Sequence, residues 1–173
     1  ISCNGGSNGS ATVSVTGGTP SYSYSWAPSG GTAATASGLS AGTYTCTITD
    51  ANSCSITATV NLTEPSAISA TTSQTNISCN GGNNGSASVF ASGGIPAYTY
   101  FWAPSGGTAS TASSLSTGTY TCTITDANGC STTATVNITE PAAITVINSQ
   151  TDLTCFGSND GTATVSVSGG TPS

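Results

Sequence analysis

The chain has 173 residues, contains no Lys, Arg, His or Met, and carries six carboxylates that give it a net charge of −6. Without Lys or Arg it has no cations to contact the phosphates of nucleic acid or the headgroups of anionic lipid, and without His it lacks imidazole as a nucleophile's base or a metal ligand. We therefore expect no enzyme, no cofactor, no metal site and no nucleic-acid partner.

No run of 18 or more apolar residues occurs, so we expect no membrane insertion. Loops rich in Asn, Asp and Gly could offer oxygen ligands to Ca²⁺. About three carboxylates per repeat are too few for such a site, which takes six to eight oxygens including several carboxylates.

The sequence repeats with a fixed period. Cys3, Cys79 and Cys155 are 76 residues apart, as are Trp26 and Trp102. Residues 1–76 and 77–152 match at 55 of 76 positions. Such self-similarity is typical of a tandem array of structural units.

Each unit ends in an alternating apolar run followed by a carboxylate and a proline, at Glu64-Pro65 and Glu140-Pro141. Because proline cannot donate to a strand ladder, it suits a strand boundary. We therefore predict domains at 1–64, 65–140 and 141–173. The first is expected to lack its opening strand and the third to be only the start of a repeat.

Within 65–140 the period-two alternation of apolar residues predicts strands and no helix. A hairpin turn is expected at 126–129. Seven short strands in about 76 residues predict an all-β fold, namely tandem Ig-like antiparallel β-sandwich repeats. The expected strands are Ala67–Ser73, the short continuation Asn76–Cys79, Ser86–Ser92, Ala97–Trp102, Thr108–Leu115, Thr119–Thr125 and Cys130–Thr139.

The segment Leu39–Cys46 resembles the corner that precedes strand F of immunoglobulin-type domains. In that corner a tyrosine two residues before a cysteine, here Tyr44, hydrogen-bonds backwards to the main chain. Trp26 stands where that fold keeps its core tryptophan. The second strand, Ser10–Thr16, holds no cysteine, so the usual disulfide between strands B and F cannot form.

The seven cysteines divide as three, three and one among the repeats. Alternation counted from neighbouring residues puts Cys3, Cys46 and Cys54 on inward faces, with Ile56 beside Cys54. Three cysteines per repeat allow three pairings, each leaving one thiol unpaired. A zinc site is disfavoured, because no CxxC occurs and no His is present.

Two sets of outward residues are candidates for contact with partners. A hydroxyl face is expected along one strand of each repeat, although threonine is also simply a good strand residue. Three apolar residues of the second repeat replace Ser14, Thr19 and Ser25 of the first, and they are candidates for self-association. The hydroxyl face consists of Thr43, Thr45, Thr47 and Thr49, repeated as Thr119, Thr121, Thr123 and Thr125, and the apolar set of Phe90, Ile95 and Phe101.

Together these motifs resemble the SprB repeat, a module of long surface adhesins of gliding and other Bacteroidota. The resemblance is carried by Ser2–Ala11, Gly17–Trp26, Leu39–Tyr44 and Thr49–Cys54, and recurs in the second repeat. It implies secretion, display at the cell surface and a role in adhesion or motility.

The family pattern keeps the first and third cysteine of each repeat, which implies the disulfides Cys3–Cys54 and Cys79–Cys130. Cys46 and Cys122 are then expected as buried thiols, and Cys155 has no partner in this sequence. A Cys3–Cys46 bond, or a thiol used between chains, is the alternative.

We therefore expect an extracellular structural or adhesive stalk module that assembles into a surface filament or fibre, with neighbouring repeats or chains as its partners. Low surface charge offers little repulsion against such packing. The alternative is a module that binds a surface glycan or another surface directly.

Overall fold

The computed structural model describes residues 1–171, and every regular element in that range is a β-strand. The all-β expectation is confirmed. By their contacts the residues divide into two compact units, Ile1–Ser69 with Ala91–Tyr98 and Thr125–Thr132, and Ala70–Phe90 with Thr99–Ile124 and Thr133–Ser173. Residues 172 and 173 of the predicted domain 141–173 lie outside the described residues.

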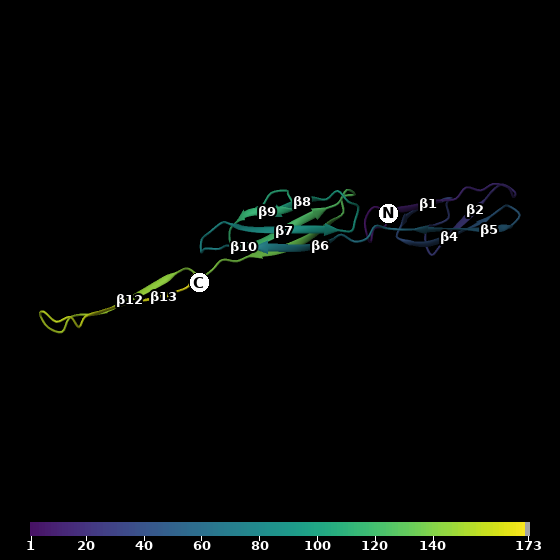
Figure 1. Ribbon diagram of the computed structural model, residues 1–173. Helices are drawn as coiled ribbons and strands as arrows, with labels where there is room; N and C mark the ends of the chain where they lie inside the picture. Colours follow the sequence, from purple (N-terminus) through teal and green to yellow (C-terminus); the bar gives the residue numbers. More distant parts are fainter. Residues whose placement is uncertain (172–173) are drawn as a thin grey trace. The chain divides into compact units, whose positions relative to one another are not determined.

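The first repeat forms two antiparallel sheets (Figure 1). In one, β1 (Gly9–Thr12) pairs with β3 (Thr35–Leu39). In the other, β4 (Gly42–Thr49) lies between β2 (Ser23–Ala27) and β5 (Ser55–Leu62). The register of β4 and β5 runs unbroken from Gly42 opposite Leu62 to Thr49 opposite Ser55.

The second repeat forms the same two sheets with one strand more. Its strands are β6 (Ser69–Thr75), β7 (Gly85–Ser92) and β9 (Thr111–Leu115) in one sheet, and β11 (Ser131–Ile138), β10 (Gly118–Thr125) and β8 (Thr99–Ala103) in the other. The additional strand is β6, which has no counterpart within 1–64. Each sheet among the described residues lies inside one of the predicted domain ranges; the boundaries themselves stay a prediction.

Beyond the second repeat, β12 (Thr145–Thr151) and β13 (Thr162–Ser168) pair along their whole length as an antiparallel hairpin. All residues of both strands are exposed, among them Val146, Ile147, Val165 and Val167. The hairpin corresponds to β6 and β7 of the second repeat, without the strands that cover those two.

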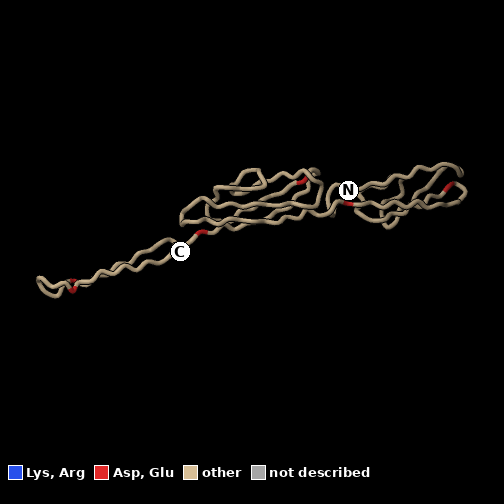
Figure 2. The backbone as a smooth tube through the Cα atoms, viewed as in Figure 1, with Lys and Arg blue, Asp and Glu red and all other residues tan. Residues whose placement is uncertain are grey.

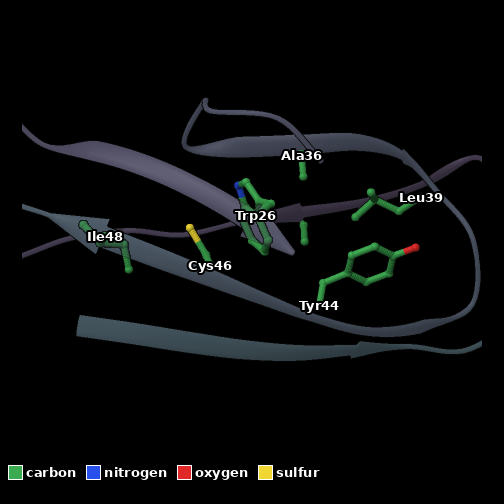
Figure 3. Close-up of a cluster of buried hydrophobic side chains, with 7 residues drawn as sticks. Trp26, Ala36, Leu39, Tyr44, Cys46 and Ile48 are labelled. Atoms are coloured by element: carbon green, nitrogen blue, oxygen red, sulfur yellow. The ribbon is translucent and has the colours of Figure 1, made fainter. Parts of the chain in front are cut away.

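The core of the first repeat is held between its two sheets, as Figure 3 shows. Trp26 of β2 lies opposite Cys46 of β4, while Ala36 and Leu39 reach the same cluster from β3 of the other sheet. Burial of such side chains on facing sheet surfaces is what stabilises a sandwich. The second repeat buries the equivalent set: Trp102, Ala112, Leu115, Tyr120, Cys122 and Ile124.

The tyrosine corner forms in both repeats. Tyr44 Oη donates to the carbonyl of Ser40 at 3.1 Å, and Tyr120 Oη donates to that of Ser116 at the same distance. The phenol ring remains in the core while its hydroxyl satisfies a main-chain carbonyl at the corner. The predicted backward hydrogen bond is confirmed.

Some predicted strands are shorter or absent. Residues 76–79 form no strand, because the chain bends there and Gly82 N–H donates to the carbonyl of Cys79 across a turn. Of the predicted Thr108–Leu115 only 111–115 is strand, and of Ser10–Thr16 only the part to Thr12.

Inward placement of Cys54 and Ile56 was wrong: Cys54 is exposed, and Ile56 exposes 67% of its surface. In the second repeat the counterpart of Ile56 is Thr132. Thr132 lines a hollow together with Ile68, the residue immediately before β6. The first repeat has no strand equivalent to β6 and no residue equivalent to Ile68 in this chain. Ile56 therefore lacks the neighbour that Thr132 has, although alternation along the strand placed it inward.

Candidate functional site

The structure contains one disulfide among its described residues, and it joins two repeats. Cys3 bonds Cys130, with their Cα atoms 5.7 Å apart and a sequence separation of 127. The expected pairs Cys3–Cys54 and Cys79–Cys130 were wrong, since Cys54 and Cys79 are free and exposed. In the chain-entropy model a loop of this length stabilises the folded state by about 5 kcal/mol.

The geometry of a single repeat explains the error. The loop after Cys3 contacts Glu64 and Pro65, which follow β5, whereas Cys54 immediately precedes that strand. Eight residues of strand separate the two places by about 25 Å at roughly 3.3 Å per residue. Disulfide Cα atoms lie about 4.4–6.8 Å apart, so cysteines at opposite ends of one repeat cannot bond each other.

A carboxylate ties the loop of Cys3 to the linker between repeats. Glu64 accepts hydrogen bonds from Gly5 N–H at 2.7 Å and from Asn4 Nδ2 at 3.0 Å. The same amide of Asn4 donates to the carbonyl of Pro65 at 3.1 Å. The arrangement recurs one period later, with Gly81 N–H donating to Glu140 at 2.6 Å and Asn80 to the carbonyl of Pro141 at 3.1 Å.

A second carboxylate shapes the turn that holds Cys130. Asp126 accepts the N–H groups of Ile95, Asn128 and Cys130, each at 2.9 Å. These donors, Ile95 first, hold the pKa of Asp126 below its ordinary value, because they bind the charged form. Asp50 accepts the equivalent three N–H groups in the first repeat, and its pKa is lowered for the same reason.

Further hydrogen bonds close this region. Gly94 N–H donates to the carbonyl of Ser66 at 2.8 Å, and Asn128 Nδ2 donates to that of Ser2 at 2.9 Å. Gly93 has φ +77°, and a Cβ there would come within 2.1 Å of the Ala67 carbonyl oxygen, so only glycine admits the linker. We call this region the joint: residues 2–5, 64–68, 93–95 and 126–132.

The joint surrounds a hollow of about 330 Å³ lined by residues from all four of its segments. Among the residues that line the hollow, Asp126 is the one with a carboxylate, and main-chain N–H groups already bind that carboxylate. Nowhere in residues 1–171 do three His, Cys, Asp or Glu side chains gather as a metal site would require. The same range contains no helix able to cross a membrane. What the joint holds is a covalent bond between repeats.

The remaining cysteines fall into two groups. Cys46 and Cys122 are fully buried free thiols within the cores, the first shown in Figure 3. Burial raises the pKa of Cys122, which keeps it as an uncharged thiol. Cys155, like Cys54 and Cys79, is exposed and free.

The predicted hydroxyl face exists and spans three strands. Thr47 lies opposite Ser25 of β2 on one side and Thr57 of β5 on the other. Thr45 lies opposite Thr59, with their hydroxyl oxygens 3.4 Å apart. Thr43, Thr49, Thr119, Thr121, Thr123 and Thr125 occupy the alternating outward positions of β4 and β10.

The three apolar candidates are exposed but do not form one patch. Phe90 exposes 64%, Phe101 60% and Ile95 38% of its surface. Phe90 lies on β7 and Phe101 on β8, which belong to different sheets, and Ile95 lies in the turn between those strands.

The charges are few and all negative (Figure 2). With no cation available, Asp160 of the last loop accepts hydrogen bonds from the hydroxyls of Ser158 and Thr154, which lower its pKa to about 2. In the same loop Phe156, which replaces the asparagine of the other repeats, is fully exposed.

Comparison with known protein families matches the chain to the SprB repeat. The model of the SprB repeat matches the chain three times, at residues 1–32, 71–108 and 147–173, which together exceed half of its length. No curated protein matches the chain.

The lowered pKa of Asp126 predicts a pH dependence of stability. The folded pKa lies below the unfolded value of about 3.9, so the stabilisation is complete above that value and is lost as the pH falls through the folded pKa. We expect Asp126→Asn to reduce stability at pH 7 and to weaken the acid-induced fall, because the neutral amide replaces the charged acceptor.

The measurement is the urea midpoint at pH 7 and pH 2, followed by tryptophan fluorescence. Asp152→Asn, in an exposed loop, serves as the matched control. An Asp126→Asn variant with the unchanged protein's midpoint at both pH values would contradict the account.

Proposed function

Because this chain belongs to the SprB repeat family, we propose that it is a structural and adhesive stalk module of a long extracellular repeat protein. The family is associated with surface-exposed proteins, and its repeats are modules of surface adhesins. The module acts by holding its neighbours in place, without catalysis. In support, the sequence offers no His, Lys or Arg from which a nucleophile's base or an oxyanion stabiliser could be drawn.

The observation that carries this proposal is the covalent joint. A flexible tether would need only a linker of small polar residues. Here the linker is instead fixed by Gly94 N–H, Asn4 and Gly5, and a disulfide closes the region around it. A covalent bond of this kind keeps two repeats joined under tension, which is the property a surface stalk requires.

We further propose that modules associate side by side into a filament or fibre. Two phenylalanines, Phe90 and Phe101, are exposed on different sheets, so one module offers apolar contact to two neighbours. Lack of cations and scarcity of carboxylates leave little repulsion between such surfaces.

A second function, direct binding of a surface glycan, draws on the hydroxyl face. Rows such as Ser25, Thr47 and Thr57 present hydroxyls in register across three strands. Hydroxyls that both donate and accept hydrogen bonds suit the hydroxyls of a sugar.

The stalk proposal predicts how the chain extends under force. When residues 1 and 173 are pulled apart, the segment enclosed by Cys3 and Cys130 cannot extend, so the oxidised chain should fall short of the reduced one by roughly 400–450 Å. Single-molecule force spectroscopy measures this difference.

Cys3→Ser should abolish the difference, and Cys79→Ser, which removes an exposed free thiol, should preserve it. Equal full extension of the oxidised and reduced chains would contradict the proposal that the disulfide carries tension between repeats.

The filament proposal predicts that Phe90→Ser with Phe101→Ser reduces self-association, because serine stands at both matching positions of the first repeat. Analytical ultracentrifugation of the chain across a concentration series measures the effect. Ser14→Ala with Ser25→Ala is the control in the first repeat, and unchanged association of the double serine variant would count against the proposal.

The glycan alternative predicts a different response. Thr47→Val with Thr123→Val, which keeps the strand-forming shape and removes a hydroxyl from each repeat, should weaken binding to a glycan array severalfold while leaving sedimentation unchanged. Failure of the unchanged chain to bind any glycan on the array would exclude this alternative.

A further inference from the structure

The joint is built from two halves that belong to different repeats. One half is the loop of Cys3 with the linker from Glu64 to Ile68, and the other is the Gly93–Ile95 turn with residues 126–132. Because the sequence repeats every 76 residues, each half recurs elsewhere in the chain. Cys54 occupies the position of Cys130, and Cys79 occupies that of Cys3.

The half around Cys54 has the same turn and hollow as the half around Cys130, but no linker occupies it. It surrounds a hollow of about 160 Å³ lined by Gly18, Asp50, Cys54 and Ser55, which are the counterparts of Gly94, Asp126, Cys130 and Ser131. The turn is already ordered, since Asp50 accepts its N–H groups just as Asp126 does. A Cβ at Gly17 would meet nothing within 4 Å, whereas at its counterpart Gly93 the linker fills that space.

The half around Cys79 is also formed and also open. Its hollow of about 470 Å³ is lined by Cys79, Asn80, the segment Pro141–Ile144 and Gly170. Glu140 already fixes the loop through Gly81 N–H. The linker Pro141–Ile144 is also held in place, because Gly170 N–H donates to the carbonyl of Ala142 at 2.8 Å. Gly94 N–H makes the equivalent hydrogen bond to the carbonyl of Ser66.

We propose that Cys54 and Cys79 are the two halves of further inter-repeat disulfides. Cys79 bonds the cysteine that follows the Asp-Ala-Asn turn of the next repeat, and Cys54 bonds the cysteine that opens the Cys-Asn-Gly-Gly loop of the preceding repeat. The partner of each cysteine is thus a neighbouring SprB repeat in the same chain. The two repeats make the same contacts as those around the Cys3–Cys130 bond. This inference concerns bond connectivity and does not rest on the stalk function.

The bond forms by thiol–disulfide exchange with a disulfide oxidant, either a small-molecule disulfide or a protein disulfide donor. The thiolate of Cys79 attacks the oxidant and releases one of its sulfurs as a thiol. The thiolate of the partner cysteine then attacks the Cys79 sulfur and releases the second. Two thiols lose two protons and two electrons, and the oxidant leaves as two thiols.

The loops closed by successive disulfides overlap, because the bonded cysteines are further apart than one repeat is long. Each bond spans 127 positions while the repeat advances by 76, so the bond from Cys79 begins inside the loop closed by Cys3 and Cys130. Consecutive bonds therefore interlock along the array, and no repeat is held by the main chain alone.

The test lengthens the full chain by one repeat, with residues 98–173 copied once after Ser173 and the copied Thr133, which lies outside the joint, changed to Ser as a mass label. The chain is oxidised with glutathione disulfide, free thiols are alkylated, and the monomer fraction is digested without reduction for mass spectrometry. We expect Cys79 to be linked to the copied Cys130, whereas in the 173-residue chain Cys79 is fully alkylated.

A copied Cys130→Ser should restore full alkylation of Cys79, with Cys3–Cys130 unchanged. A second chain, with residues 1–76 copied ahead of Ile1 and its copied Ser7 changed to Thr, should link Cys54 to the copied Cys3. Tryptophan fluorescence verifies folding of each chain. Cys79 or Cys54 alkylated in a folded lengthened chain, linked to another cysteine, or recovered only in a covalent dimer would overturn the proposal.

Discussion

In this chain carboxylates have no cationic side chain to pair with, and the rest of the structure depends on how they are satisfied instead. Asp126 binds three main-chain N–H groups, and Glu64 binds Gly5 N–H together with the amide of Asn4. Hydrogen bonds to a charged acceptor are stronger than those between neutral groups. These hydrogen bonds fix the shapes of two loops, and these are the loops that bring Cys3 to Cys130.

The sequence predicts what local periodicity controls. Alternation placed Cys46 in the core, and the resemblance of four motifs to the SprB repeat indicated the family that the family model matches. The disulfide pairing escaped because it depends on which end of a repeat each loop occupies, a property set by the length of β5 and by the neighbouring repeat. Glu64 carried a signal that could have located its loop, since it precedes the linker proline in every copy. Ile56 was misplaced for a related reason: alternation along β5 does not show whether another segment covers a given position, and Ile56 exposes 67% of its surface.

The two sandwiches share the central residues of their cores and differ at several exposed positions. Substitutions between the copies spare Trp26, Leu39, Tyr44 and Cys46, whose counterparts occupy the same buried positions. Among the positions that differ are exposed sites such as Phe90 and Phe101, and one exchange in the core, Leu62 for Ile138, keeps an aliphatic side chain. The side chains that fill the centre of each core are therefore the same in both copies, while exposed positions differ.

The bond from Cys3 to Cys130 also changes what a protease can achieve. Exposed loop tips are the usual sites of cleavage, and this chain has one at nearly every strand connection. A cut at any peptide bond between the two cysteines opens a ring without detaching either fragment. A first cut within that ring therefore leaves both pieces covalently linked, and a fragment is released only after a further break.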